Sequence, residues 1–395
     1  MRHPSIRSVP VGLAALLLSA CASVQVSAPP PRVEAPAPVA PRSAHWSFDA
    51  GSRPPAEPDG YRPPNRLAVL LPLTGSLATA AAPVRDGLLA GYYGERRRRP
   101  ELRFYDTSTT TGGAIAAYQQ AVADGADQVL GPLGKDQVEA VFRQSRGSVP
   151  VLALNRPDTT PPVNNASYAL APEDDGIGAA NYLVARNARR VLVLSAGDDN
   201  ARRSVAAFDR QLQSQGGSVV QTLAVVGESP ADMTALLQSA AQREDGVDAV
   251  FLALRGSQAR AIAPQLSAAG LAGKPLVATS QLASGTGKPG QDRALDGIAF
   301  PTDAWSVSGV RGLPSAASTG RTLATARGPA ARLFAFGYDA WLLTAYLERL
   351  ALAEDGSVQG ASGTLRIDAD GNVMRTPAWS TFSGGSIVPL MGSGG

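Results

Sequence analysis

Three polar stretches could take part in recognising a ligand, because each follows an apolar run that is typical of a buried strand. Thr74, Gly75 and Ser76 follow the first run, Gly131 the second and Asn155 the third. Hydroxyl groups, a side-chain amide and the N–H groups of a glycine-containing loop can bind a carboxylate or a phosphate. In open α/β sheets, the carboxyl ends of parallel strands form such crevices. We therefore expect these five residues to line a cleft.

The same residues also have structural explanations. The loop Thr74–Ser76 can have a conformation that belongs to the fold, with the cleft empty or facing a protein partner. Gly131, which precedes a proline, can serve the backbone shape at a strand end, and Asn155 can cap a loop instead of binding a ligand. The sequence leaves these alternatives open.

Catalytic and metal chemistry is limited by the scarcity of histidine and cysteine. The single cysteine, Cys21, and both histidines, His3 and His45, precede Arg66. From Arg66 onward, Ser-His-Asp and Cys-His catalysis and the usual zinc and copper sites are therefore excluded. Paired carboxylates, a Ser–Lys pair or an oxygen-ligand metal site remain, but the sequence has no motif for them. We predict no catalytic residue, no metal and no cofactor.

One segment, Asp368–Asn372, resembles the start of a calcium-binding loop. It lacks a further ligand and the glutamate that closes such a loop at its twelfth position. We interpret it as the turn of a hairpin between strands at 363–367 and from 373 onward.

The segments that would position these residues alternate between strand and helix patterns. The run 67–71 is apolar throughout, as expected of a strand that helices cover on both faces. The alternation continues to residue 154, is interrupted at 168–175 and then resumes, which predicts parallel sheets with right-handed crossovers. We expect the first helix to start near Pro83, and Glu173–Asp175 to start the helix that follows the interruption.

This pattern predicts an α/β protein with two lobes, each a mostly parallel sheet flanked by helices. About 325 residues follow residue 65, which also suggests two lobes rather than a single core. We assign residues 66–169 and 304–352 to lobe one, and residues 170–303 and 353–390 to lobe two. A surface loop is expected at 306–327 and a long helix at 332–352, with Asp339 capping across to lobe one.

The first twenty residues predict an export signal with a positive start and a short apolar core. The core is about half the ~20 residues that a membrane-spanning helix needs. Cys21 follows Leu18-Ser19-Ala20, an arrangement that resembles the lipobox of bacterial lipoproteins, in which this cysteine is lipidated. An ordinary secretory signal is the alternative. Ala22, where an aspartate would favour retention at the inner membrane, points to the outer membrane.

Residues 21–65 are expected to be a lipidated, proline-rich and disordered tether, because they contain few large apolar residues. Trp46 and Phe48 are exceptions and could dock on the domain or on a partner. The net charge of +3 is too small to indicate nucleic-acid binding. The run Arg96–Arg99 is expected to be a solvated helix end, with an acidic lipid, glycan or protein contact as the alternative.

Several phrases of the sequence are similar to one family. They are AVLLPLTG at 68–75, VLGPLG at 129–134, VPVLALN at 149–155, FAFGYDAWLL at 334–343 and GTLRIDADGNVMRTPAWSTF at 363–382. Together, behind a lipobox, they resemble the penicillin-binding-protein activator lipoproteins of the LppC/LpoA family. The resemblance implies the type I periplasmic-binding-protein fold, whose two lobes enclose a cleft. Larger family members carry an N-terminal helical-repeat domain, where this chain has its proline-rich segment.

The resemblance implies a non-catalytic lipoprotein of the outer membrane, anchored at Cys21 on the periplasmic face. Its partner would be a class A penicillin-binding protein, a bifunctional peptidoglycan synthase that it activates. An alternative is a solute receptor that binds an amino acid or another small ligand in the cleft between its lobes, since branched-chain amino-acid-binding proteins share the LPLTG and GP elements. A cell-wall enzyme with paired carboxylates is a third hypothesis, for which no spaced acid pair is present.

Overall fold

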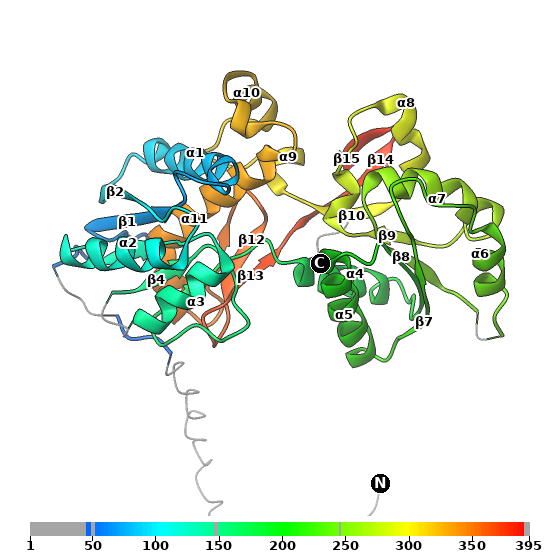
Figure 1. The fold of residues 1–395 in the computed structure, drawn as a ribbon, viewed down its shortest axis with the longest axis horizontal. Helices are drawn as coiled ribbons and strands as arrows, with labels where there is room; N and C mark the ends of the chain where they lie inside the picture. The colour runs from blue at the N-terminus through cyan, green and yellow to red at the C-terminus, as the bar shows by residue number, and fades with distance from the viewer. Residues whose placement is uncertain (1–44, 49–51, 146–148, 245, 391–395) are drawn as a thin grey trace, which may run out of the picture. The chain divides into compact units, whose positions relative to one another are not determined.

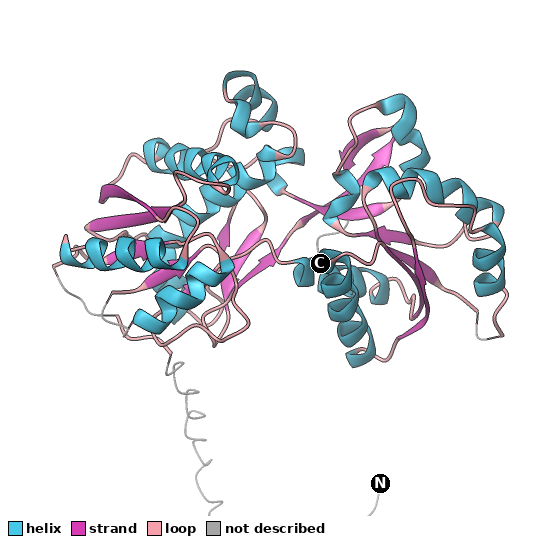
Figure 2. Cartoon of the chain, in the orientation of Figure 1, coloured by secondary structure: helices cyan, strands magenta, loops and turns pink. Residues whose placement is uncertain are grey.

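The computed structural model describes residues 45–48, 52–145, 149–244 and 246–390, which form two main sheets flanked by helices (Figure 1; Figure 2). The first sheet and its helices are built from β1 (Arg66–Leu71), α1 (Ala78–Gly94), β2 (Glu101–Asp106), α2 (Thr111–Ala123), β3 (Gln128–Leu130), α3 (Lys135–Gln144), β4 (Val151–Ala153), β5 (Ala166–Ser167) and α11 (Ala330–Leu352). The second comprises α4 (Pro172–Val184), β6 (Arg190–Ser195), α5 (Asp199–Ser214), β7 (Ser218–Ala224), α6 (Thr234–Ala241), β8 (Ala249–Ala253), α7 (Gly256–Ala268), β9 (Leu276–Ala278), β10 (Ala299–Thr302), β14 (Ala378–Ser383) and β15 (Ser386–Pro389).

The remaining elements are short. They are η1 (Ser280–Ala283), α8 (Pro289–Asp292), η2 (Arg293–Leu295), α9 (Ala304–Val307), α10 (Ala316–Thr322), η3 (Ala324–Ala326), β11 (Val358–Gln359), β12 (Thr364–Ile367) and β13 (Val373–Thr376). The last three strands form a small antiparallel sheet, β11-β12-β13. The hairpin predicted around Asp368–Asn372 is therefore confirmed.

The first sheet is parallel, with the order β2-β1-β3-β4-β5. Strand β1 is buried on both faces, as its uninterrupted apolar run predicts. Leu67, Val69 and Leu71 pack in a cluster with residues of α1 and α11, whereas Ala68 and Leu70 pack with residues of α2 and α3. Successive strand residues point to opposite faces, so one strand serves two helical layers.

The second sheet has the order β15-β14-β10-β9-β8-β6-β7, and only β14 and β15 run antiparallel to their neighbours in it. Along β6, Leu192 and Leu194 pack with residues of α6 and α7, whereas Val191 and Val193 pack with residues of α4 and α5. Each sheet thus has its own pair of helical layers, which confirms the predicted fold class.

The chain passes between the sheets three times. It leaves the first after β5, returns between β10 and α9, and leaves again between β13 and β14. The first two passages lie at the predicted positions. The third corrects the expected assignment of 353–390 to lobe two, because Leu365 and Val373 belong to the core cluster that contains β1. Only β14 and β15 extend the second sheet, and an antiparallel strand pattern does not reveal which sheet it joins.

Two local predictions were wrong. Helix α1 begins at Ala78, one turn before the predicted start, and Pro83 lies inside it. The alanine-rich segment before Pro83 has a high helix propensity, and this outweighs the preference of proline for the first turn. The segment 306–327 contains α10 and η3 and the end of α9, rather than a loop alone.

The expected tether boundary at residue 65 is also wrong, because residues 45–48 and 52–65 pack against the first sheet. Trp46 is 9% exposed and stacks on Phe48 at a centroid distance of 5.4 Å, and Tyr61 is 2% exposed. His45 therefore belongs to the folded part of the chain, where its Nε2 donates to the carbonyl of Asn165 at 2.7 Å. The predicted signal, Cys21 and the chain up to residue 44 lie outside the described residues.

Candidate functional site

A cavity of about 380 Å³ lies where the strands of both sheets end. Its lining includes Asn155 and Arg156 after β4, Asp175 of α4, Ser280 after β9 and Arg332 of α11. Apolar side chains of Leu133, Leu154, Leu170, Leu254, Leu333 and Phe336 complete much of the wall. The volume lies in the range of small-molecule sites, which are mostly apolar with a few convergent polar groups.

A chain of polar contacts connects the two sides of the cavity. Asp175 lies in the first turn of α4, where the helix dipole favours a carboxylate, as predicted for Glu173–Asp175. Its Oδ2 accepts hydrogen bonds from the N–H of Ser280 at 2.9 Å and from the Ser280 hydroxyl. Arg332 also donates to the Ser280 hydroxyl oxygen. These contacts tie α4, the end of β9 and the start of α11 together.

A second set of buried charges lies next to Asp175. The Arg375 side chain is 2% exposed, and its Nη2 is 3.5 Å from Oδ1 of Asp175. Arg156 Nη1 is 3.6 Å from Oδ1 of Asp174. Burial raises the pKa of Asp174 and that of Asp303. Burial lowers the pKa of Arg375, but the nearby carboxylates of Asp175, Asp174 and Asp303 raise it by more. The pKa therefore lies above its usual value, and the guanidinium stays charged.

Several atoms of this cluster have no hydrogen-bond partner among the described residues. They are Oδ2 of Asp174, Oδ1 of Asp175, Nε of Arg156, and Nε and Nη2 of Arg375. Opposite charges are close enough to attract but too far apart for charge-assisted hydrogen bonds. Buried polar groups normally have partners, so this region is suited to ordered water or to polar atoms of a ligand.

A further buried carboxylate, Asp339 of α11, binds the segment that precedes β12. It accepts hydrogen bonds from the N–H groups of Ala361 and Ser362 and from the Tyr168 hydroxyl, the last at 3.2 Å. Burial raises the pKa of Asp339 to about 7, although these hydrogen bonds act in the opposite direction. The side chain thus joins α11 to the residues after β5 and before β12, close to the predicted capping role.

Among the predicted cleft residues, Asn155 lines the cavity. Its amide group donates to the carbonyl of Leu133 at 2.9 Å, and its Oδ1 accepts from the N–H of Arg156 at 2.9 Å. Both polar atoms are therefore engaged by backbone groups, one in the connection between β3 and α3 and one in the loop of Asn155 itself. Asn155 shapes the loop that presents Arg156, which corresponds to the loop-cap alternative.

The other four predicted residues do not line the cavity. Thr74, Gly75 and Ser76 are exposed and are not part of the cavity lining. The hydroxyl of Thr74 donates to Oδ2 of Asp106 at 2.6 Å, which fixes the loop to the end of β2. Gly131 is buried with a φ of 101°, and a Cβ there would lie 2.1 Å from the carbonyl oxygen of Leu70. Gly131 therefore allows the end of β3 to lie close to the backbone of β1.

Sequence reasoning missed the arginines of the site: Arg156, Arg203, Arg255 and Arg332 line the cavity, and Arg375 pairs with Asp175 beside it. Each comes from a different part of the chain, and an isolated arginine carries no spacing signal. Arg375 had one available signal: it lies two residues after the apolar Val373, so in a strand both side chains point to the same face, and both are buried in β13. A buried arginine in a strand implies a carboxylate partner, but not which one.

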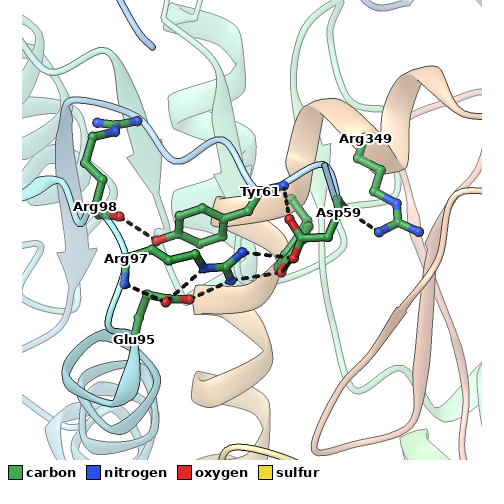
Figure 3. Close-up of polar contacts among 7 residues, drawn as sticks. Asp59, Tyr61, Glu95, Arg97, Arg98 and Arg349 are labelled. Atoms are coloured by element: carbon green, nitrogen blue, oxygen red, sulfur yellow. Dashed lines mark hydrogen bonds and ion pairs between the residues drawn. The ribbon is translucent and has the colours of Figure 1, made fainter. Parts of the chain in front are cut away.

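In the run Arg96–Arg99, predicted to be a solvated helix end, Arg96, Arg97 and Arg99 are exposed, but two of the side chains also bind other parts of the molecule. It follows the end of α1. Arg97 binds Glu95 and Asp59, and Arg98 donates to the carbonyls of Pro63 and Pro64. Arg97 and Arg98 therefore help to hold the segment that leads into β1 (Figure 3).

A match to one protein family covers most of the chain. The profile described as "LppC putative lipoprotein" matches residues 61–385, which contain both sheets and the cavity. The chain belongs to this family. Proteins named "Penicillin-binding protein activator LpoA" are similar to it in Photobacterium profundum (27% identical over 363 residues, 82% of this chain and 57% of the relative), Vibrio cholerae (29% over 355 residues, 80% and 57%) and Escherichia coli K12 (26% over 334 residues, 73% and 47%).

This LppC-family chain spans about half the length of these relatives. Among solved structures, the "LpoA (YraM) C-domain from Haemophilus influenzae, a regulator of PBP1A" has a TM-score of 0.70 at 22% identity, covering 82% of this chain and 100% of that one. A "putative branched-chain amino acid ABC transporter" from Chromobacterium violaceum has a TM-score of 0.64 at 28% identity, covering 80% and 99%. The type I periplasmic-binding-protein-like fold is thereby confirmed.

None of the described helices is long and apolar enough to cross a membrane. In the same part of the chain, no group of three or more His, Cys, Asp or Glu side chains is arranged to hold a metal ion.

Proposed function

We propose that this LppC-family protein is a lipid-anchored regulator that binds and activates a class A penicillin-binding protein. The observation that carries the proposal is the family match over residues 61–385, together with relatives that are named activators over the same region. Activation requires that the protein binds the active state of the synthase more tightly than the inactive state. The protein itself would need no catalytic group, metal or cofactor.

The anchor would be Cys21, lipidated after removal of the signal, and Ala22 favours the outer membrane. Several acyl chains on one residue give stable membrane attachment, whereas one chain gives only a marginal anchor. Labelling cells with a radioactive fatty acid should mark the wild-type chain, and Cys21→Ser should abolish the label. Labelling of the Cys21→Ser variant would contradict the assignment.

The binding step can be tested with purified proteins. The chain from residue 45 onward, immobilised on a surface, should retain class A synthases from a membrane extract. It should also bind the purified synthase that mass spectrometry identifies. A heat-unfolded sample of the same chain serves as the control. Retention of no synthase would contradict the proposal.

A second candidate function, a receptor for a small solute, is favoured by one observation. Much of the cavity wall is apolar, and beside it lie buried charged atoms that have no hydrogen-bond partner in the described part of the chain. A thermal-shift screen against amino acids and peptidoglycan fragments tests it. A ligand that raises the melting temperature of the wild type should fail with Arg332→Gln, which changes the lining, but not with Ser76→Ala, which lies outside it. No shift with any compound would contradict this candidate.

A further inference from the structure

The segment between β10 and α11 carries a positive charge that no acidic residue within it balances. Residues 304–338 contain four arginines and neither aspartate nor glutamate, whereas the whole chain has a net charge of only +3. Arg332 lines the cavity, but Arg311, Arg321 and Arg327 are exposed. These three side chains form no ion pair or hydrogen bond with any other described residue. Their charges are therefore available to a partner.

Contacts along α1 fix the position of this segment. η3 packs against α1, α10 and α11, and the Thr325 hydroxyl donates to Oδ2 of Asp86 at 2.7 Å. Further along the helix, a Cβ on Gly94 would lie 3.7 Å from the carbonyl oxygen of Gly312, which places Arg311 close to the C-terminal end of α1. The segment therefore lies beside the second half of α1.

Helix α10 buries none of its seven residues. In Figure 1 it projects outward at the top of the view, above α1 and α11. A Cβ on Gly320 would lie 3.1 Å from the Cβ of Arg327, so the neighbouring Arg321 belongs to the same region of the surface. Leu323, directly after the helix, is 38% exposed. The surface of α10 is thus open to a partner.

The end of α1 adds positive charge and an exposed aromatic ring. Tyr93 is 70% exposed, and the guanidinium of Arg99 lies 5.8 Å from the centroid of its ring. Arg96 and Arg99 are exposed, and neither forms an ion pair within the described part of the chain. The carboxylate of Glu95 does not neutralise them, because it binds Arg97 at 2.8 Å. We call the following residues the arginine surface: Tyr93, Arg96, Arg99, Arg311, Arg321 and Arg327.

We propose that the arginine surface docks an acidic patch on a protein partner. This assignment rests on the proposed function, in which the partner is a class A penicillin-binding protein. Guanidinium groups bind carboxylates through two parallel hydrogen bonds, so the matching patch would be rich in Asp and Glu. Tyrosine and arginine are enriched among the residues that contribute most to protein interfaces. Tyr93 and Leu323 supply apolar contact area, which suits a protein better than a purely ionic partner.

Binding of the full chain to the purified synthase tests the assignment. A variant with Arg311→Glu, Arg321→Glu and Arg327→Glu should weaken binding by about tenfold or more. The control variant reverses three exposed arginines elsewhere that also lack ion pairs among the described residues, and it should weaken binding by less than about twofold. Its substitutions are Arg210→Glu, Arg293→Glu and Arg366→Glu. Both variants should keep the melting temperature of the wild type, because all six side chains are exposed. Equal affinities of the two variants would overturn the proposal.

Two measurements do not depend on the charge-reversal variant being folded. Higher salt should weaken binding of the wild type, because salt screens the attraction between exposed charges. Tyr93→Ala should weaken binding by about fivefold, since the ring lies among the arginines of the surface. An affinity that salt does not change, or a Tyr93→Ala variant that binds like the wild type, would contradict the assignment.

An anionic membrane is the other class of partner for exposed arginines, and vesicles that contain phosphatidylglycerol test it. The Cys21→Ser chain is used, so that no lipid anchor contributes. We expect this chain not to bind the vesicles. Vesicle binding that is lost with the three substitutions in the arginine surface would assign this surface to lipid and overturn the proposal.

The same experiments separate this proposal from the function on which it rests. If the wild type neither binds nor activates the synthase, the proposed function fails, and the docking proposal fails with it. If the wild type activates the synthase and the charge-reversal variant activates it equally well at every concentration, the docking proposal alone fails.

Discussion

Asp339 is a single carboxylate at the point where α11 meets the passage between the sheets. Its pKa is raised from 3.8 to about 7 because it is fully buried. A folded-state pKa above the unfolded-state value means that the native protein binds the proton more tightly. The stabilisation is complete below the unfolded-state pKa and is lost as the pH rises through about 7.

We therefore expect the free energy of unfolding of the wild type to fall by up to about 4 kcal/mol between pH 4 and pH 8, relative to Asp339→Asn. The amide cannot ionise, so the variant lacks this term, whereas Asp174 and Asp303 titrate in both proteins. Urea unfolding at several pH values measures the difference. Parallel pH profiles of the two proteins would contradict the assignment.

Arg375 is the buried cation that faces Asp174, Asp175 and Asp303. Replacing it with glutamine leaves these carboxylates buried without their main counter-charge. We expect Arg375→Gln to reduce the free energy of unfolding by about 3 to 5 kcal/mol. Arg366→Gln, on the exposed side of the neighbouring strand β12, should change it by less than about 0.5 kcal/mol. Similar urea midpoints for the two variants would show that Arg375 is not needed as a counter-charge.

Helices α1 and α11 approach each other closely because glycines face each other at their contact. A Cβ on Gly87 would lie 1.9 Å from the carbonyl oxygen of Phe334, and a Cβ on Gly337 would lie 1.9 Å from that of Val84. Neither backbone can move without shifting a whole helix. The two glycines therefore set the distance between α1 and α11, which pack in one cluster with β1.

We expect Gly87→Ala to reduce the free energy of unfolding by about 2 kcal/mol or more, although alanine is the better helix former. Gly112→Ala in α2, where a Cβ would meet nothing within 4 Å, should instead stabilise the protein by up to about 1 kcal/mol. Thermal unfolding of both variants provides the comparison. Stabilisation by both substitutions would contradict the close helix contact.

At the scale of elements, the sequence predicted what local pattern determines. The uninterrupted apolar run of β1 and the alternation of strands and helices were sufficient to predict two covered sheets. The pattern did not reveal that β12 and β13 join the first core, because pairing is decided by tertiary contacts. It also did not reveal that Trp46 and Tyr61 dock, because a proline-rich composition describes the segment and not its contacts.

At the scale of the whole molecule, the position of the cavity could be predicted from the sequence, but most of the residues that line it could not. Carboxyl ends of parallel strands do surround it, and Asn155 lies in its wall. Its charges, however, come from segments that are far apart in the sequence, among them the loop after β4, α4, α5 and α11. Thr74 and Ser76 looked suitable because hydroxyl groups in a glycine loop are common ligands, yet Asp106 already engages Thr74. Only the folded chain shows which polar groups are already paired.

The central claim is that this two-lobed LppC-family protein activates a peptidoglycan synthase without performing chemistry itself. The most direct test is the rate of glycan polymerisation by a purified class A penicillin-binding protein, measured with and without an excess of the chain from residue 45 onward. The proposal predicts a saturable increase in the synthase rate and no product from the chain alone. An unchanged synthase rate at saturating concentration would contradict it.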